Sequence, residues 1–222
     1  MRKWRLNELN MILETRAAAP FFKNGFVVGC KDTREGILID PGDEVGELLA
    51  AVAAHKLAIR YILLTHAHID HITGVGAAKR ALGAPTGLHR ADHFLYKAIV
   101  QQGQMLGVPV EPQPEIDFFY EGTGPWRFGN YGAWVYHTPG HCPGGVCLAV
   151  GREGEAARTL FVGDTLFAGS IGRTDLPGGD LDTLVRSIRD VLFRFPDETT
   201  VYPGHGEPTT IGVEKRSNPF LA

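Results

Sequence analysis

The spacing of apolar residues along the chain predicts an alternation of strands and helices. Short apolar runs at residues 26–28, 36–40 and 59–64 are typical of buried strands, and residues 10–40 as a whole are predicted to be strands joined by turns. After the turn sequence at residues 41–43, apolar residues recur at helical spacing, which predicts a helix over residues 44–55.

The same two patterns continue through the rest of the chain. A proline-rich segment at residues 107–114 separates two halves and is predicted to be a surface loop. Each half runs from strands to helix, so the pattern by itself favours a mixed α/β fold, and we expect one domain over residues 1–222. The further predicted helices cover residues 72–82, 91–106 and 181–193, and the further strands cover residues 116–120, 134–137, 146–150, 159–162 and 200–202.

Composition narrows the class of protein. The 222 residues are 44% hydrophobic and 21% charged, with a net charge of -3, which is ordinary for a globular chain. Lysine and arginine form no basic footprint, so we expect no nucleic-acid partner. Apolar stretches all fall short of the roughly 20 residues that span a bilayer, so we expect no membrane partner.

Cysteine usage and the start of the chain indicate a compartment. Cys30, Cys142 and Cys147 are too scattered for a disulfide framework and form no Cys-x-x-Cys pair, which favours a reducing environment. Residues 1–10 lack the apolar run of a signal peptide. We therefore expect a cytoplasmic protein, while the oligomeric state is left open.

The strongest chemical signal is a cluster of possible metal ligands directly after the 59–64 run. In His66-Ala-His68-Ile-Asp70-His71, residues two apart in an extended segment face the same way, so His66 and His68 can point at one ion. Asp70 and His71 can point at a neighbouring ion. Imidazole and carboxylate are ligands that zinc accepts, and gathering them has no benefit to stability without a cation to bind.

Three further candidates stand directly after glycines at predicted strand ends. Glycine lets the backbone approach closely and turn sharply. We expect two divalent ions, zinc first, with iron and manganese as alternatives that suit the same ligands. One ion would be held by His66, His68 and His141, the other by Asp70, His71 and His205, with Asp164 bridging them through its two oxygens.

The remaining candidates favour structural interpretations. A lone histidine at a strand end is most often a hydrogen-bonded structural residue, so His141 or His205 alone would indicate nothing. Cys142 could ligate a soft metal, but its side chain is expected to point away from that of His141. Surface or hydrogen-bonding roles are expected for the other four histidines, His55, His89, His93 and His137.

The order of these candidate ligands along the chain resembles that of the metallo-β-lactamase superfamily, and the resemblance extends from about residue 20 to the end. Residues 65–74, 163–175 and 202–211 are similar to its glyoxalase II (hydroxyacylglutathione hydrolase) branch, and residues 214–219 resemble the short bacterial members of that branch. The resemblance implies a four-layer αββα sandwich, the metallo-β-lactamase fold, with the seven ligands named above.

The resemblance also implies an activity. Enzymes of the glyoxalase II type hydrolyse thioesters such as S-lactoylglutathione with a hydroxide that bridges two metal ions, so a small-molecule thioester is the expected substrate. Asp164 would bridge the ions and Asp70 would orient the nucleophile, which makes both catalytic residues. Arg173 stands where the branch has a basic residue near glutathione, and it would bind a substrate carboxylate.

The sequence departs from that branch in two respects. Too few residues follow His205 for the helical C-terminal domain that contacts glutathione in full-length glyoxalase II. Aromatic residues expected after the basic residue and after the last histidine are replaced by Thr174-Asp175 and Gly206-Glu207. The sequence therefore leaves open whether glutathione is the thiol carrier.

Other functions fit parts of the pattern. Persulfide dioxygenases are similar in fold and in the Gly-Arg-Thr-Asp segment at residues 172–175, but they use a single iron, which His66, His141 and Asp164 would hold here. Relatives that process nucleic acids would need a basic arm. True β-lactamases usually carry a secretory signal and use other ligands in the second site, and a non-enzymatic binding module would not need seven ligands.

Overall fold

The computed structural model describes residues 10–221 and contains a six-stranded N-terminal sheet with the order β1-β2-β3-β4-β5-β6. The segment 1–9, where no signal peptide is predicted, lies outside the described residues. Strands β1 to β3 pair antiparallel, and β3 to β6 pair parallel. The strands are β1 Met11–Ala18, β2 Lys23–Cys30, β3 Glu35–Ile39, β4 Ala58–Leu63, β5 Thr86–Leu88 and β6 Phe118–Phe119.

A second six-stranded sheet has the order β14-β13-β10-β9-β8-β7. Strands β10 and β13 are parallel and the other neighbours are antiparallel, while β11 and β12 form a separate hairpin. The strands are β7 Trp126–Phe128, β8 Tyr131–His137, β9 Val146–Gly151, β10 Thr159–Gly163, β11 Leu166–Phe167, β12 Ser170–Ile171, β13 Thr200–Pro203 and β14 Thr209–Thr210.

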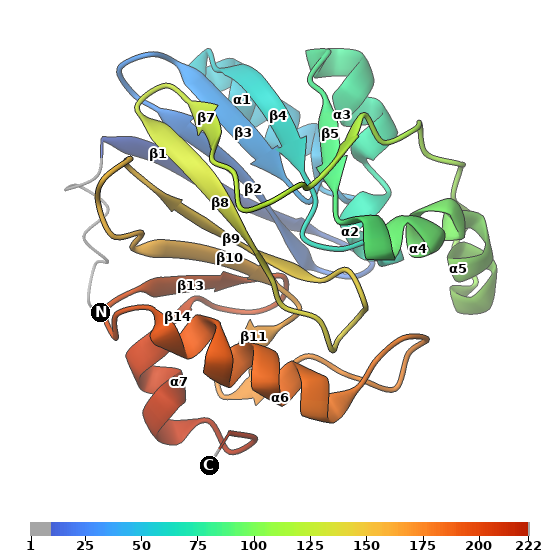
Figure 1. The fold of residues 1–222 in the computed structure, drawn as a ribbon. Helices are drawn as coiled ribbons and strands as arrows, with labels where there is room; N and C mark the ends of the chain where they lie inside the picture. Colours follow the sequence, from blue (N-terminus) through green and yellow to red (C-terminus); the bar gives the residue numbers. More distant parts are fainter. Residues whose placement is uncertain (1–9, 222) are drawn as a thin grey trace.

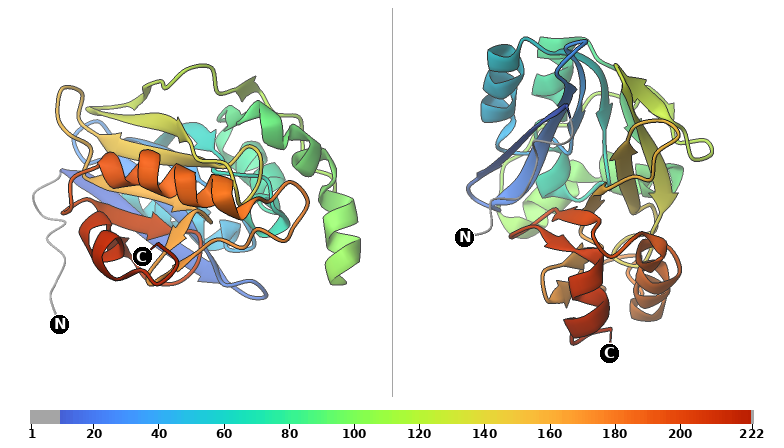
Figure 2. Two further views of the ribbon diagram at one scale, coloured as in Figure 1. Left: turned by 60° about the horizontal axis from the view of Figure 1, so that its bottom comes forward. Right: turned by 90° about the vertical axis from the view of Figure 1, so that its left-hand side faces the viewer.

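Helices lie on the outer side of each sheet, as Figures 1 and 2 show. The N-terminal sheet is covered by α1 Val45–His55 and α3 Val75–Leu82, and the C-terminal sheet by α6 Leu181–Asp190 and α7 Ile211–Ser217. The expected αββα sandwich is therefore confirmed. Within residues 10–221, no helix is long and apolar enough to cross a membrane. The remaining helical segments are α2 Ile69–Ile72, α4 His93–Lys97, α5 Ile99–Leu106 and the 3-10 turns Arg90–Asp92 and Leu192–Arg194.

Three apolar clusters correspond to the three interfaces between the four layers. In β2, Val27 packs outward toward the cluster that contains Leu48 of α1, while Phe26 and Val28 pack inward against the second sheet. The inner cluster joins the sheets, for example where Phe26 meets Phe161 with ring centroids 4.9 Å apart. Strands β2 and β3 are buried on both faces, which explains why 26–28 and 36–40 appear in the sequence as apolar runs. Strand β4 is buried only at its end, from Ile62 onward.

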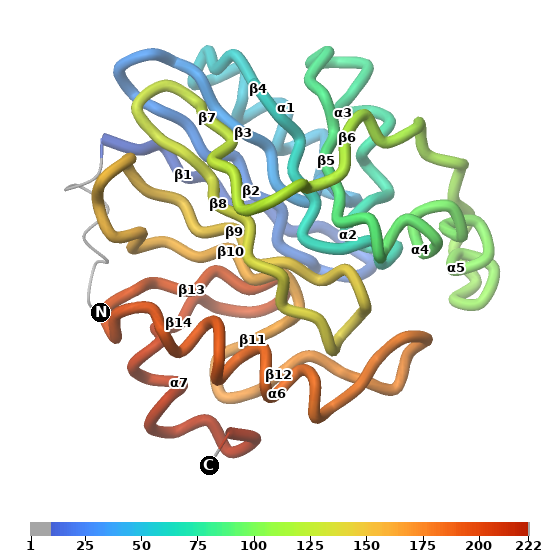
Figure 3. Tube along the Cα trace, in the orientation of Figure 1, coloured from blue at the N-terminus to red at the C-terminus, as the bar shows by residue number. Residues whose placement is uncertain are grey.

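The structure corrects several predicted boundaries. The helix predicted over residues 72–82 begins earlier and breaks into α2 and α3, because the backbone N–H of Gly74 donates to the carbonyl of Pro41. The helix predicted over residues 91–106 is likewise divided at Ala98 into α4 and α5, and only Phe118–Phe119 of the 116–120 segment is a strand. Figure 3 traces the segment 107–117, which returns from α5 to β6 as an irregular loop and extends past the loop predicted over residues 107–114.

Strand direction brings several loops to one edge of the sandwich. Strands β3 and β4 are parallel, so the loops after both leave the same end of the N-terminal sheet. Strands β8, β10 and β13 share one direction, so the loops after them leave the same end of the C-terminal sheet. Loops at the carboxyl ends of such strands are where α/β proteins usually place their functional groups.

Candidate metal centre

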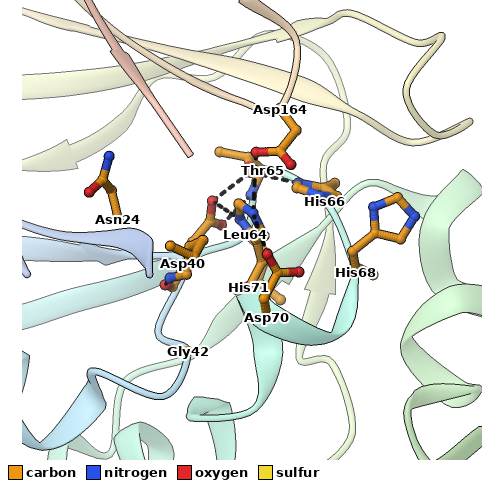
Figure 4. Close-up of polar contacts among 12 residues, drawn as sticks. Asn24, Asp40, Gly42, Leu64, Thr65, His66, His68, Asp70, His71 and Asp164 are labelled. Carbon is orange, nitrogen blue, oxygen red and sulfur yellow. Dashed lines mark hydrogen bonds and ion pairs between the residues drawn. The ribbon is translucent and has the colours of Figure 1, made fainter. Parts of the chain in front are cut away.

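The cluster at residues 66–71 leaves β4 in an extended conformation and then enters a short helix. His68 is extended, with φ -73° and ψ 152°, and α2 begins at the next residue. His66 and His68 therefore precede the bend, while Asp70 and His71 follow it in α2, as the sequence predicts. Figure 4 shows these four side chains close together below Asp164.

The first donor set consists of His66, His68 and His141. One ligand atom from each of these buried side chains lies within 4.8 Å of the others. The Nδ1 atom of His68 lies 2.8 Å from Nε2 of His141, although 73 positions separate these residues in the sequence. The loop after β8 thus brings His141 to the pair that follows β4.

The second donor set consists of Asp70, His71 and His205, whose ligand atoms also lie within 4.8 Å of one another. Oδ2 of Asp70 lies 3.0 Å from Nε2 of His205 and 3.7 Å from Nε2 of His71. The loop after β13 therefore completes this set, as the sequence predicts.

Asp164 lies between the two sets. Its Oδ1 is 3.4 Å from Nε2 of His71, and its Oδ2 is 3.7 Å from Nε2 of both His141 and His205. Ligands of one tetrahedral zinc at about 2.0–2.1 Å are about 3.3 Å apart, so these separations are close to those of ligands that share an ion. The position of Asp164 suits a carboxylate that contacts two ions.

Two glycines allow this close approach. At Gly163, φ is +51°, and a Cβ atom would lie 2.5 Å from Oγ1 of Thr65. At Gly204, a Cβ atom would lie 2.2 Å from Oδ1 of Asp164. The glycines that the sequence places before Asp164 and His205 are therefore required by the packing of the ligand loops.

Hydrogen bonds to Nδ1 orient two of the imidazoles. Nδ1 of His71 donates to Oδ2 of Asp40 at 2.9 Å, and Nδ1 of His141 donates to the carbonyl oxygen of Arg173 at 2.7 Å. Because both partners accept, Nδ1 carries a proton in each ring, so Nε2 is the nitrogen that can bind a metal ion. Sequence reasoning missed Asp40, although it follows β3 just as the ligands follow β4, which was the available signal.

Asp40 also groups with His66 and His71 as a possible ligand cluster. Its carboxylate is already engaged, because it accepts from the backbone N–H and the hydroxyl of Thr65 at 2.7 and 2.5 Å as well as from His71. Asp40 therefore supports the ligands from behind rather than joining them.

The donor atoms fit a bound cation because several are buried without a partner. Among the described residues, these atoms include Nε2 of His66 and of His71, and Oδ1 of Asp164. A buried polar atom without a partner is unfavourable, and buried groups of this kind are normally paired or bound to a metal. Seven oxygen and nitrogen donors around two adjacent points match the ligand preference of zinc and of iron.

Electrostatics also favour a cation. Burial, reinforced by neighbouring imidazoles, lowers the pKa of His66 well below its ordinary value and that of His68 to about 4, so both are neutral at pH 7. Burial would raise the pKa of Asp70 and of Asp164, but the charge of His71, together with hydrogen bonds and charges of the other neighbouring histidines, outweighs it and lowers both. Burial would lower the pKa of His71, yet Asp70, Asp164 and Asp40 raise it to about 10. The second set thus carries surplus negative charge.

The other candidate side chains lie outside these sets. The Arg173 guanidinium forms two 2.7 Å hydrogen bonds with Asp175, so only its carbonyl contacts a ligand histidine. The thiol of Cys142 donates to Asp92, which confirms that it points away from His141. His89 stacks on His137 at a centroid distance of 4.1 Å, outside both sets.

Comparison with known proteins finds relatives over nearly the whole chain. The sequence profile described as the metallo-beta-lactamase superfamily matches residues 18–205. The hydroxyacylglutathione hydrolase GloC of Haemophilus influenzae is 36% identical over 192 residues, which cover 86% of this chain and 89% of that protein.

Solved structures superpose closely as well. The B3 metallo-β-lactamase BLEG-1 gives a TM-score of 0.85 at 35% identity, covering 95% of this chain and 99% of that one. The protein TTHA1623 in a di-iron-bound form gives 0.82 at 38% identity, covering 94% and 100%. ETHE1 from Myxococcus xanthus gives 0.75 at 29% identity, covering 94% and 83%.

Proposed function

The chain belongs to the metallo-β-lactamase superfamily, and we propose that it is a metal-dependent hydrolase that cleaves a small-molecule thioester, as glyoxalase II does. The observation that carries the proposal is the pair of three-residue donor sets on either side of Asp164. The similarity to a hydroxyacylglutathione hydrolase over 86% of the chain supports the thioester as substrate.

The proposed cofactor is a pair of divalent ions. When bound, such ions lower the pKa of a water molecule toward neutrality and polarise a carbonyl group. Zinc is the proposed metal, and the di-iron form of TTHA1623 supports iron as the alternative, while manganese also suits the ligands. His66, His68 and His141 would hold one ion, Asp70, His71 and His205 the other, and Asp164 would contact both.

Residues of the chain would prepare the reaction in two ways. Asp40 and the Arg173 carbonyl keep His71 and His141 in the tautomer that leaves Nε2 free. Asp70, whose pKa is lowered by His71 against the effect of burial, is ionised at pH 7 and can accept a hydrogen bond that orients the attacking water. A thiolate is a better leaving group than an alkoxide, since a thiol ionises near pH 8.5.

Arg173 is the proposed contact for a substrate carboxylate. Its side chain is 61% exposed and pairs with Asp175, which is 68% exposed. A guanidinium binds one carboxylate through two parallel hydrogen bonds, so a substrate carboxylate would take the place of Asp175.

The test combines metal content with turnover. We expect the purified protein, stripped with a chelator and reloaded with zinc, to bind two ions per chain and to hydrolyse S-lactoylglutathione. A protein that binds two ions but cleaves no member of a panel of acyl thioesters would contradict the proposed substrate. A protein that binds fewer than two ions would contradict the proposed centre.

A single-iron oxygenase acting on a persulfide is the second candidate, supported by the 29% identity to ETHE1. His66, His141 and Asp164 would form its site, and Oδ2 of Asp164 lies 3.7 Å from Nε2 of His141. Oxygen uptake with glutathione persulfide by the iron-loaded protein distinguishes it from a hydrolase. The similarity to BLEG-1 makes β-lactam hydrolysis a further control reaction. The cytoplasmic location stays a prediction from the sequence.

A further inference from the structure

Lys23 and Glu44 form a buried ion pair beside the second donor set. Nζ of Lys23 lies 2.7 Å from Oε1 of Glu44, and each side chain is only 1% exposed. Nζ also donates to the carbonyl oxygen of Asp40, and Oε1 accepts from the backbone N–H of Gly42 at 2.9 Å. The pair therefore holds the segment 40–44 that follows β3.

Burying this pair is unfavourable in itself. Both charges lose hydration that their mutual attraction only partly offsets, so apolar side chains of similar size would stabilise a fold at least as well. Lysine and glutamate are almost never fully buried unless paired. Stability alone therefore does not explain the pair, but its contacts suggest a role at the site.

One chain of contacts leads from Lys23 to His71. Lys23 holds the carbonyl of Asp40, whose φ is +47°, and the carboxylate of Asp40 accepts from Nδ1 of His71 at 2.9 Å. That hydrogen bond directs the unpartnered Nε2 of His71 toward Asp70 and Asp164. Lys23 thus acts on the orientation of one second-set donor.

Another chain of contacts leads to His205. The backbone of Lys23 forms an antiparallel bridge with His205. The next residue, Asn24, donates from its backbone N–H to the carbonyl of Gly204 at 2.7 Å, and its amide donates to two more carbonyls of the same loop. The start of β2, anchored through Lys23 on Glu44, therefore supports the loop that carries His205.

The first donor set is linked to Asp40 at one point, because the Thr65 hydroxyl that donates to Asp40 lies 3.1 Å from Nδ1 of His66. Its other contacts are with different groups. His141 is held by the carbonyl of Arg173, and the backbone N–H of Ala67, between His66 and His68, donates to Asp92. We propose that the Lys23–Glu44 pair is a positioning device for the second metal ion, so that loss of the pair lowers the affinity for that ion selectively. This inference rests on the proposed two-ion centre.

The test titrates chelator-stripped protein with zinc by calorimetry and with cobalt(II) by visible absorption, and it records thermal unfolding of the metal-free chain. In Lys23→Met, we expect the second dissociation constant to rise about 10–100-fold, as for loss of other groups that orient ligands. The first constant should stay nearly unchanged. Glu44→Gln keeps the size of the side chain and should give a smaller loss of the same kind, which remains measurable if Lys23→Met folds poorly. Lys97→Met, in the exposed pair with Glu115, is the matched control and should change neither constant.

The outcomes separate this inference from the proposed function. A wild-type chain that binds no second ion overturns both. A wild-type chain with two ions, combined with variants whose constants are unchanged or rise equally at both sites, overturns only the positioning role. The positioning role is also overturned if the double variant Lys23→Met, Glu44→Leu binds the second ion with wild-type affinity. An apolar pair would then position the loops as effectively as the ion pair does.

Discussion

The carboxylate of Asp92 accepts a hydrogen bond from the thiol of Cys142, with the sulfur 3.1 Å from Oδ2. The same fully buried carboxylate accepts from the backbone N–H groups of Ala67 and Gly144, at 3.1 and 2.5 Å. Asp92 therefore fastens the segment that carries His66 and His68 to the loop that carries His141.

Replacing Asp92 with asparagine should weaken the first metal site. Asparagine replaces one carboxylate oxygen with an NH2 group. That group would face a backbone N–H that now donates to the carboxylate, and two donors repel each other, so one of the two loops must shift. We expect a loss of about 10–100-fold in zinc affinity, measured by calorimetry. Cys142→Ser retains a donor for Asp92 and should have a far smaller effect, and equal losses in the two variants would argue against the role of the carboxylate.

Replacing Asp164 with alanine should remove the second ion and most of the turnover. The variant loses the carboxylate that lies 3.4 Å from His71 and 3.7 Å from His141 and His205. An ion contributes several kcal/mol to the transition state, so we expect the rate of thioester hydrolysis to fall at least about a hundredfold. Metal content per chain and the rate are measured together, and unchanged values of both would exclude the bridging role.

The metal-free protein should lose stability as the pH falls from about 6.5 to about 4. Burial lowers the pKa of His68 to about 4 in the folded chain, against about 6.5 in the unfolded chain. Between these values the unfolded state binds more protons, so the free energy of unfolding falls by up to about 1.4 kcal/mol per pH unit for this group. Thermal unfolding of chelator-treated protein across this range measures the slope.

The same experiment checks whether the loss of stability at low pH comes from His68. His71, with its pKa raised to about 10, is protonated in both states below about pH 6.5, so it does not oppose the trend. Its own contribution to stability is fully present below about pH 6.5 and is lost progressively as the pH rises from there to about 10. The variant His68→Gln should show a shallower slope between pH 4 and 6.5, and an unchanged slope would assign the loss to other groups.

Replacing Arg173 with methionine should raise KM while kcat changes little. The guanidinium is proposed to hold a substrate carboxylate, and a charged hydrogen bond contributes about 1.5–3 kcal/mol, which corresponds to about tenfold or more in KM. Metal content should stay the same, because His141 contacts the backbone carbonyl of this residue. Asp175→Asn removes the competing carboxylate and should lower KM. If neither variant alters KM, Arg173 does not contact the substrate.

The grouping of the candidate metal ligands could be predicted because their signal is local. Four of them fall within residues 66–71, and His141, Asp164 and His205 each follow a glycine at a strand end. The apolar run 59–64 that precedes the cluster also predicted β4, whose last two residues are buried. The structure brings all seven side chains together in the grouping that the sequence favours.

The supporting residues could not be predicted in the same way. Lys23, Asp40 and Asp92 act through partners that are 17 to 52 positions away. Asp40 had a signal in its place directly after the apolar run of β3. A single charged residue is otherwise most often exposed, so nothing local marks Lys23 and Asp92 as buried. Tertiary contacts likewise decided the helix break at Gly74. For the unpredicted α7 a signal existed, because Thr210 caps its N-terminus by accepting from the N–H of Val213.

The donor loops leave different layers of the sandwich: residues 66–71 follow a strand of one sheet, and His141, Asp164 and His205 follow strands of the other. A cation bound by donors from both sheets would link the two sheets to each other. Cys30, Cys142 and Cys147 are all free thiols, so no disulfide cross-links the described residues 10–221. The metal link would restrict the unfolded chain in the way that a disulfide does in other proteins. Metal binding and the association of the two sheets would then be coupled, so that each favours the other.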